Sequence, residues 1–294
     1  MFYDCHTHTS YSGHSEDYTI SGLKEEAARK GIEISIREHA PLPSEFFDET
    51  RKNHYIHSGK YPVTNFVLHS GTIFPFFTEA AKSDISLGFE VDILPGFEKG
   101  TERMLRNMGI VANYFGVQID AINGSHHIYN GRYWDFSPET LADAIRIAGG
   151  CNKFIKSYFG QIRDAMKTGF YGTISHLEFI CRFNAQGSEL ESIFLKSKET
   201  YGEEIEKTFS VAKECNVAIE YNTSGIDAKL KSPYLSGNAL HLAYHMNVPL
   251  VIGSDAHAAR QIGRHFDFAA KQMKEYGINK LHYFKNREMA SYSI

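Results

Sequence analysis

Two pairs of metal-ligand side chains lie near opposite ends of this chain with the same spacing. His6 and His8 follow a short apolar segment at the start, and Asp255 and His257 follow the apolar residues 248–253. Because side chains alternate between the two faces of a strand, residues two apart point to the same side. Imidazole and carboxylate groups are typical ligands of zinc, manganese and iron. The spacing therefore predicts a metal site assembled from strand ends that are distant in the sequence.

Similar side chains end most of the other segments that we predict to be strands. They are His14 in the first loop, Glu38 and His39, Glu90 and Asp92, His126 and His127, His176, and Glu220 with Asn222. In an α/β barrel the carboxyl ends of the strands face one side, where catalytic residues gather. One histidine is more often an ordinary residue, but this many at equivalent positions indicates a shared site. Since a catalytic zinc ion takes about three protein ligands, we expect two or three divalent ions, Zn, Mn or Fe.

The elements that would position these residues alternate between strands and helices. We predict strands at residues 2–5, 32–36, 86–93, 118–123, 172–175, 218–221 and 250–252, and helices at residues 19–30, 138–148, 151–168, 199–214 and 237–246. Thr19 and Gly31 have the residue types that begin and end a helix. This alternation predicts a parallel sheet with crossover helices. No linker composition interrupts it, so we expect one domain over residues 1–294.

Residues 41–77 depart from this rhythm, since they are rich in aromatic residues, histidine and proline and have no clear period. Long segments of this kind often cover an active site. We expect a loop or a short helical insertion beside the strand ends. Phe46, Phe47 and Tyr55 are candidates to cover a substrate, and Glu45 or Asp48 to bind an amine.

The composition narrows the functional class. The 294 residues are 42% hydrophobic and 22% charged, as in a globular enzyme, and 31 basic against 35 acidic residues give a net charge of −4. With this balance the chain has no excess of positive charge that would bind nucleic acid electrostatically. The four cysteines are scattered and indicate reduced thiols. The chain lacks a signal pattern at its start and an apolar stretch long enough to span a membrane, so we expect a soluble, cytoplasmic protein.

The ordered set of motifs resembles the PHP (polymerase and histidinol phosphatase) superfamily. The residues around the ligands make the resemblance more specific, because the motifs at 38–43, 88–92, 220–225 and 253–257 are similar to those of the histidinol-phosphatase branch. The resemblance extends from about residue 4 to residue 265. It implies a distorted, TIM-like (β/α)7 barrel with a trinuclear metal centre.

The resemblance also implies how the ligands divide among three ions. One ion would take His6, His8, Glu90 and Asp255, a second would share Glu90 and add His127 and His176, and the third would take His14, His39 and His257. The family has one residue between a serine and the ligand, which favours His127 over His126. Asp4 and Glu220 are candidates to orient imidazoles from behind.

Phosphate recognition would require an arginine, whose planar group suits phosphate oxygens. Arg182 is the first candidate, because the family places a basic residue there, and Arg260 is the second, with a surface role equally compatible. Near residues 222–225 the family tends to carry another basic residue, but this chain has Asp227, followed by Lys229 and Lys231. The second phosphate contact therefore stays open.

The expected activity is hydrolysis of L-histidinol phosphate to L-histidinol and phosphate in histidine biosynthesis. A metal-activated hydroxide would attack phosphorus at a centre that includes Asp255, with help from Arg182. The leaving group would take its proton from His257 or from metal-bound water. Three alternatives stay open: a PHP phosphoesterase for another small ester or a nucleotide, a metal-dependent amidohydrolase, and a PHP module that binds without catalysis. The oligomeric state is not indicated.

Overall fold

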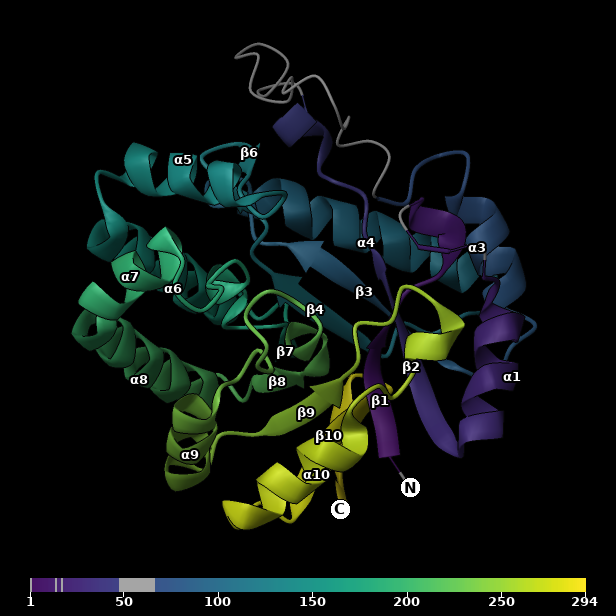
Figure 1. The fold of residues 1–294 in the computed structure, drawn as a ribbon. Coiled ribbons are helices and arrows are strands. Elements are labelled where there is room, and N and C mark those ends of the chain that lie inside the picture. The colour runs from purple at the N-terminus through teal and green to yellow at the C-terminus, as the bar shows by residue number, and fades with distance from the viewer. Residues whose placement is uncertain (1, 14, 17, 48–66) are drawn as a thin grey trace.

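Seven parallel strands form a nearly closed barrel in the structure, a computed structural model that describes residues 2–13, 15–16, 18–47 and 67–294 (Figure 1). The strands, in their order around the barrel, are β1 (Phe2–Thr7), β2 (Ile32–His39), β3 (Ser86–Asp92), β4 (Ala121–Ser125), β7 (Thr173–Ile174), β8 (Ala218–Asn222) and β9 (Leu250–Gly253). A parallel bridge between Thr7 and Ala256 brings the last strand beside the first. The backbone N–H of His8 donates to the carbonyl of Ala256 at 2.8 Å. This architecture confirms the predicted distorted (β/α)7 barrel.

Helices surround the barrel (Figure 1). They are α1 (Ile20–Lys30), α3 (Ile73–Ala80), α4 (Glu98–Tyr114), α5 (Pro138–Ala148), α6 (Cys151–Lys167), α7 (Glu189–Lys196), α8 (Lys198–Glu214), α9 (Gly237–Met246) and α10 (Phe266–Glu275). Thr19 caps α1 by accepting a hydrogen bond from the backbone N–H of Gly22, and Gly31 ends it with φ of 66°. No helix in the described ranges has both the length and the apolar character that a membrane span requires.

Short elements connect or extend this barrel. The 3-10 helices are η1 (Ser10–Ser12), η3 (Phe179–Cys181), η4 (Thr223–Ile226) and η5 (Ala259–Gln261), and the hairpin strands are β5 (Ile128–Tyr129), β6 (Arg132–Tyr133), β10 (Lys280–Lys285) and β11 (Glu288–Ser293). The sequence pattern does not predict the C-terminal hairpin. Its Phe284 packs with Cys5, Ala121, Ala218 and Val251, so the hairpin covers apolar residues of four barrel strands.

The strands extend further toward the ligand residues than the sequence pattern predicts. β1 continues to Thr7 and β2 to His39, so that His6, Glu38 and His39 belong to the sheet, although the pairing of β1 with β2 shifts register between Asp4 and Thr7. Register then places His39 beside Glu90 of β3. A ligand held by a paired strand has a fixed position, which favours a precisely built site.

Candidate metal centre

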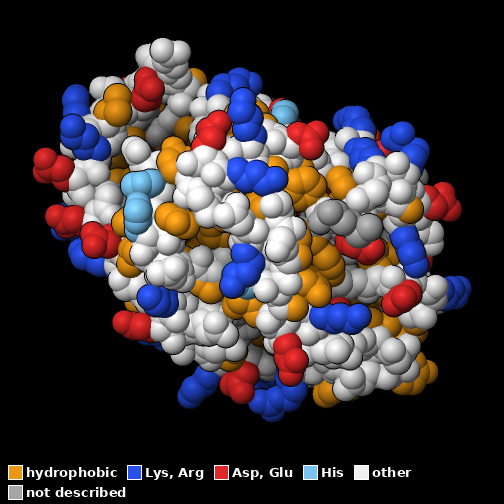
Figure 2. Space-filling model, turned by 90° about the horizontal axis from the view of Figure 1, so that it is seen from below, with side chains coloured by type: hydrophobic (Ala, Val, Ile, Leu, Met, Phe, Trp, Pro, Cys, Tyr) orange, Lys and Arg blue, Asp and Glu red, His pale blue; other side chains and the backbone are white. Residues whose placement is uncertain are grey.

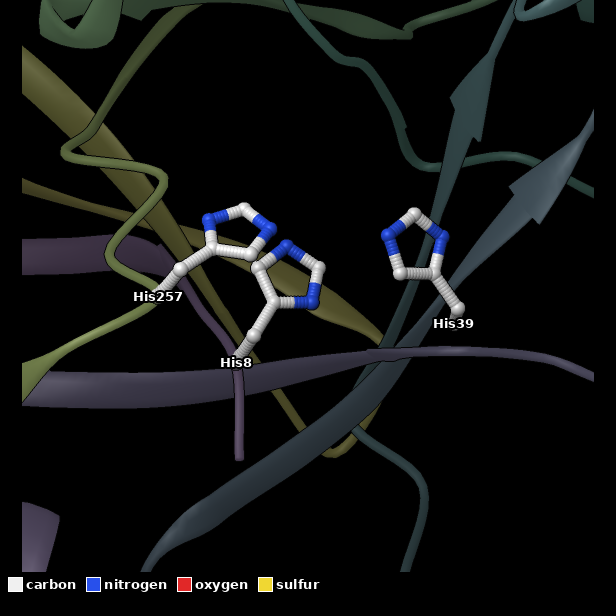
Figure 3. Close-up of side chains that lie close together, drawn as sticks. All are labelled: His8, His39 and His257. Atoms are coloured by element: carbon white, nitrogen blue, oxygen red, sulfur yellow. The ribbon is translucent and has the colours of Figure 1, made fainter. Parts of the chain in front are cut away.

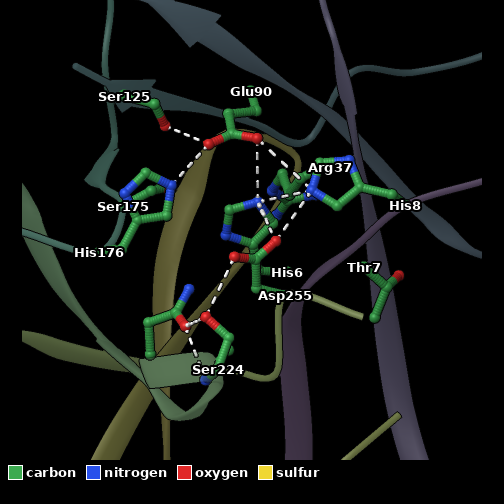
Figure 4. Close-up of polar contacts among 12 residues, drawn as sticks. His6, Thr7, His8, Arg37, Glu90, Ser125, Ser175, His176, Ser224 and Asp255 are labelled. Carbon is green, nitrogen blue, oxygen red and sulfur yellow. Dashed lines mark hydrogen bonds and ion pairs between the residues drawn. The ribbon is translucent and has the colours of Figure 1, made fainter. Parts of the chain in front are cut away.

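Glu90 of β3 lies at the middle of the candidate site and faces imidazoles from several strands (Figure 4). Its Oε1 lies 2.9 Å from Nε2 of His176, and its Oε2 lies 3.3 Å from Nε2 of both His6 and His39. The hydroxyl of Ser125 also donates to Oε1. Glu90 is buried, and the opposing histidines hold the pKa of its carboxyl well below the usual range although burial alone would raise it. An ionised carboxylate in this position can bridge two metal ions.

Three overlapping groups of side chains have ligand atoms within 4.8 Å of one another. The groups are His8, His39 and His257, drawn in Figure 3; His6, His8 and Glu90; and Glu90, His127 and His176. His8 and Glu90 each belong to two groups. The donors are all nitrogen and oxygen, which suits Zn, Mn or Fe, and their number exceeds what one ion binds. The residues therefore fit a cluster of two or three ions.

Asp255 joins this cluster from the loop after β9. Its Oδ1 lies 3.3 Å from Nε2 of His8 and 3.9 Å from Nε2 of His6. The hydroxyl of Ser224 donates to Oδ2 at 3.3 Å. Asp255 and His176 both adopt positive φ, 52° and 28°. Positive φ is uncommon for residues other than glycine, although aspartate and histidine tolerate it better than most.

His6 and His127 each have a carboxylate within hydrogen-bond distance of Nδ1, behind the ring. Oε1 of Glu220 lies 2.8 Å from Nδ1 of His6, and Oδ1 of Asp92 lies 3.0 Å from Nδ1 of His127. Burial alone would lower the pKa of His127, but the hydrogen bond and charge of Asp92 raise it to about 10. Carboxylates in this position orient imidazole ligands and increase their basicity.

The remaining ligand candidates differ in their surroundings. His126 turns away from the site, because its Nε2 lies 2.8 Å from Oε1 of Gln161 and its Nδ1 accepts from the indole of Trp134 at 3.2 Å. His127 faces Glu90 instead, at 3.7 Å. His14 lies outside the described residues. Burial and the charge of His8 lower the pKa of His257 to about 4, so its ring is neutral and offers a lone pair.

The expectation for Asp4 is wrong. Its carboxylate accepts hydrogen bonds from the backbone N–H and hydroxyl of Ser254 and from the N–H of Gly263. Asp4 therefore fixes the loop that carries Asp255 and orients no imidazole among the residues described.

A cavity of about 410 Å³ opens above the cluster. Besides the ligand candidates it is lined by Asp92, Tyr133, Asp135, Phe136, Phe179, Arg182, Ser224, Ala228, Tyr234 and Arg264. The guanidinium of Arg182 lies over the ring of Phe179 at 4.3 Å, and Phe179 packs against His176 with centroids 4.4 Å apart. The ring of Phe179 therefore lies between the predicted phosphate-binding arginine and His176 of the cluster.

The second predicted arginine lies elsewhere. Arg260 is 67% exposed, pairs with Glu16 at 2.6 Å and does not line the cavity. Arg264, which the sequence reasoning missed, does line it. Its Nε and Nη2 donate to the carbonyls of Ser254 and Asp255 at 2.9 and 3.1 Å. In the sequence, the position of Arg264 nine residues after Asp255 is the feature that could have indicated its place near the site.

The predicted amine-binding and covering residues of the 41–77 segment do not line the cavity where they are described. Glu45 forms an ion pair with Arg103 on α4. Phe46 and Phe47 belong to a small cluster with Leu42, Val67, Leu94 and Ile128. Asp48 and Tyr55 lie outside the described residues. The aromatic candidates described in this segment are therefore part of an apolar cluster, not of the cavity wall.

A family model described as "PHP domain" matches residues 4–224. Histidinol-phosphatase from Bacillus subtilis is 24% identical over 277 residues, which cover 88% of this chain and 95% of that protein. The match to the relative spans nearly its full length.

Two solved structures share the fold. A protein from Listeria monocytogenes assigned as a histidinol phosphatase aligns with a TM-score of 0.75 at 24% identity, over 90% of this chain and 99% of that one. Histidinol phosphate phosphatase from Lactococcus lactis, solved with Zn, L-histidinol and phosphate, aligns with a TM-score of 0.64 at 16% identity, over 98% of both chains. Both similarities support the seven-stranded barrel.

Proposed function

Because this chain belongs to the PHP domain family, we propose that it is a metal-dependent phosphomonoesterase that hydrolyses L-histidinol phosphate to L-histidinol and phosphate. The observation that carries the proposal is the arrangement around Glu90, whose two oxygens face separate groups of imidazoles below a cavity. The relative from Bacillus subtilis, which carries the name of this activity, supports the choice of substrate.

The metal ligands in this proposal are His6, His8, His39, Glu90, His127, His176, Asp255 and His257, with His14 expected from the sequence. Bound divalent ions would supply water activation and stabilisation of charge on the phosphate oxygens. The donor set fits Zn, Mn or Fe. His257 serves as a ligand here, since its Nδ1 donates to the carbonyl of Asp255 at 2.9 Å and its ring is neutral.

The chain's own cations would bind the phosphate group from the side of the cavity. Arg182 can donate to non-bridging oxygens from its place over Phe179. Arg264, and not Arg260, is the second cation of this proposal, because it lines the cavity beside Asp255. These two residues provide the substrate-binding cations of the proposal.

A small phosphate monoester fits this site better than a nucleic acid. The cavity holds about 410 Å³, and the net charge of the chain is −4. Basic and acidic side chains are interspersed on the face that Figure 2 shows. The solved structure of histidinol phosphate phosphatase from Lactococcus lactis contains L-histidinol and phosphate, which are both small molecules. The enzyme would act in the cytoplasm, where amino acids are made.

Phosphate release from purified protein tests the proposal. The panel is L-histidinol phosphate, a nucleoside monophosphate, a sugar phosphate and p-nitrophenyl phosphate, with Mn, Zn and Fe supplied in turn. We expect L-histidinol phosphate to exceed the others by roughly a hundredfold or more in kcat/KM. Asp255→Asn protein purified in the same way controls for contaminating phosphatases. A flat profile would contradict the substrate, and release from no ester would contradict the phosphatase reaction.

A further inference from the structure

Four carboxylates line the cavity among the described residues: Glu90, Asp92, Asp135 and Asp255. Glu90 and Asp255 face the imidazoles of the cluster, and Asp92 is bonded to His127. Asp135 instead forms an ion pair with Arg182, where Oδ2 lies 3.4 Å from Nη1. It is therefore the carboxylate in this lining that the metal centre does not use.

The second oxygen of Asp135 lacks a partner. Oδ1 is buried and accepts no hydrogen bond from the residues that the structure describes. The side chain as a whole is 14% exposed. A buried carboxylate oxygen without a donor is unfavourable, because it has given up its hydrogen bonds to water without replacing them. A cation that enters the cavity would supply the missing donor.

We propose that Asp135 binds the ammonium group of the substrate and that Arg182 turns from Asp135 to the phosphate as the substrate enters. This inference rests on the proposed function. The amine of L-histidinol phosphate is on the carbon next to the ester CH₂ group, so its ammonium and phosphate lie close together. One ligand can therefore replace the ion pair between these two side chains, because its ammonium pairs with the carboxylate while its phosphate pairs with the arginine.

The surroundings of the pair favour this exchange. Arg182 is held over Phe179 and Phe183 by ring contacts at 4.3 and 5.0 Å, which leave its guanidinium edge available to a new acceptor. Its hydrogen bond to Asp135, at 3.4 Å, is long for a charge-assisted bond. Arg182 can thus change acceptor while its stacking contacts persist.

The exchange would give the site its specificity. An ester with phosphate but no cation would draw Arg182 away and leave Asp135 buried without any partner. An ester with both groups leaves every charge paired. Discrimination through an unpaired buried group is stronger than discrimination by shape alone. The site therefore selects esters with an amine, because esters without one leave the Asp135 carboxylate unpaired.

The test compares two esters on the metal-loaded wild type and the Asp135→Asn variant. The esters are L-histidinol phosphate and 3-(imidazol-4-yl)propyl phosphate, which lacks only the amine. We expect Asp135→Asn to lower kcat/KM for L-histidinol phosphate by about 10- to 100-fold. The same variant should leave kcat/KM for the amine-free ester unchanged or raise it, because the neutral amide removes the cost of an unpaired carboxylate. Asp143→Asn on the exposed face of α5 makes the same chemical change away from the cavity and should alter neither. Metal content and thermal unfolding verify that each variant is intact.

Each other outcome overturns the inference in a distinct way. An equal loss on both esters would mean that Asp135 only positions Arg182. No loss on either would mean that it does not contact the substrate. A wild type that cleaves both esters equally well would show that the amine is not read, while the phosphatase reaction would stand. A wild type inactive on L-histidinol phosphate would overturn the proposed function as well.

Discussion

Glu220 lies behind His6, with its Oε1 2.8 Å from the Nδ1 atom of that ring. Since a carboxylate oxygen accepts, Nδ1 of His6 carries a proton, which leaves Nε2, 3.3 Å from Oε2 of Glu90, as the atom that would face a metal ion. The other oxygen of Glu220 accepts from the backbone N–H of His176 at 2.7 Å and from the amide of Asn222 at 3.1 Å. One buried carboxylate on β8 therefore orients candidate ligands on β1 and after β7.

Glu220→Gln should weaken metal binding without unfolding the barrel. The amide keeps the shape but loses the charge that favours the required tautomer of His6, and such changes cost about 10- to 100-fold in metal affinity. Metal retained after dialysis against a graded chelator series measures the effect. Glu214→Gln, on the exposed end of α8, is the matched control. Equal metal retention in wild type and Glu220→Gln would contradict the orienting role.

His8→Ala and Asp255→Asn should each abolish phosphate release while the chain stays folded. His8 belongs to two of the three ligand groups, and Asp255 lies 3.3 Å from it. Loss of either ligand should lower kcat by roughly a thousandfold or more. Phosphate release measures the activity of each variant, and circular dichroism shows whether the variant is folded. His245→Ala on the exposed face of α9 should retain activity. Full activity in either ligand variant would rule out the cluster mechanism.

Arg182→Ala should weaken binding of the phosphate ester more than it disturbs metal content. The guanidinium lines the cavity, and loss of a charge-assisted hydrogen bond should raise KM by about 10- to 100-fold. Arg260→Ala serves as the control, because this arginine is exposed and pairs with Glu16. Steady-state kinetics and metal analysis of both variants check this. Metal loss in Arg182→Ala would instead assign that residue a structural role.

The sequence predicted the parts of the site that depend on strand periodicity. His6 and His8 share one side because a strand alternates, and Glu90 meets His39 because neighbouring strands are in register. Asp135 and Arg264 were missed, since both lie in irregular connections whose direction depends on packing. The amine-binding candidate Glu45 was wrong for a related reason: residue type alone does not reveal that Arg103 on α4 lies beside it.

The fold was predicted where local signals agree with the tertiary structure. Pro138 begins α5 as expected, and Ser137 before it forms a capping box with Thr140. The C-terminal hairpin was missed because its strands alternate weakly and are stabilised by contacts with the barrel. Its Phe284 and the barrel residue Val251 share one apolar cluster, although 33 positions separate them in the chain.

Glu204 should make the free energy of unfolding of the protein depend on pH. It joins α8 to α6 through Arg163, whose Nη2 lies 2.7 Å from Oε2, and it also contacts Lys207 at 2.9 Å. Burial alone would raise the pKa of Glu204, but the hydrogen bonds and charges of Lys207 and Arg163 lower it below the usual 4.5. A carboxyl with a lowered folded pKa contributes stability above its unfolded pKa, and this contribution is lost as the pH falls through the folded pKa.

Glu204→Gln should therefore reduce the free energy of unfolding by about 1 to 3 kcal/mol at pH 7, and the difference from wild type should shrink as the pH falls below about 4.5. Urea denaturation at pH 7, 5 and 4 measures the difference directly. Glu203→Gln is the control, because Glu203 is exposed and lies 3.7 Å from the same lysine. That variant should stay within about 0.5 kcal/mol of wild type at every pH. A Glu204→Gln difference that is constant with pH would mean that packing, and not the ionised pair, joins the two helices.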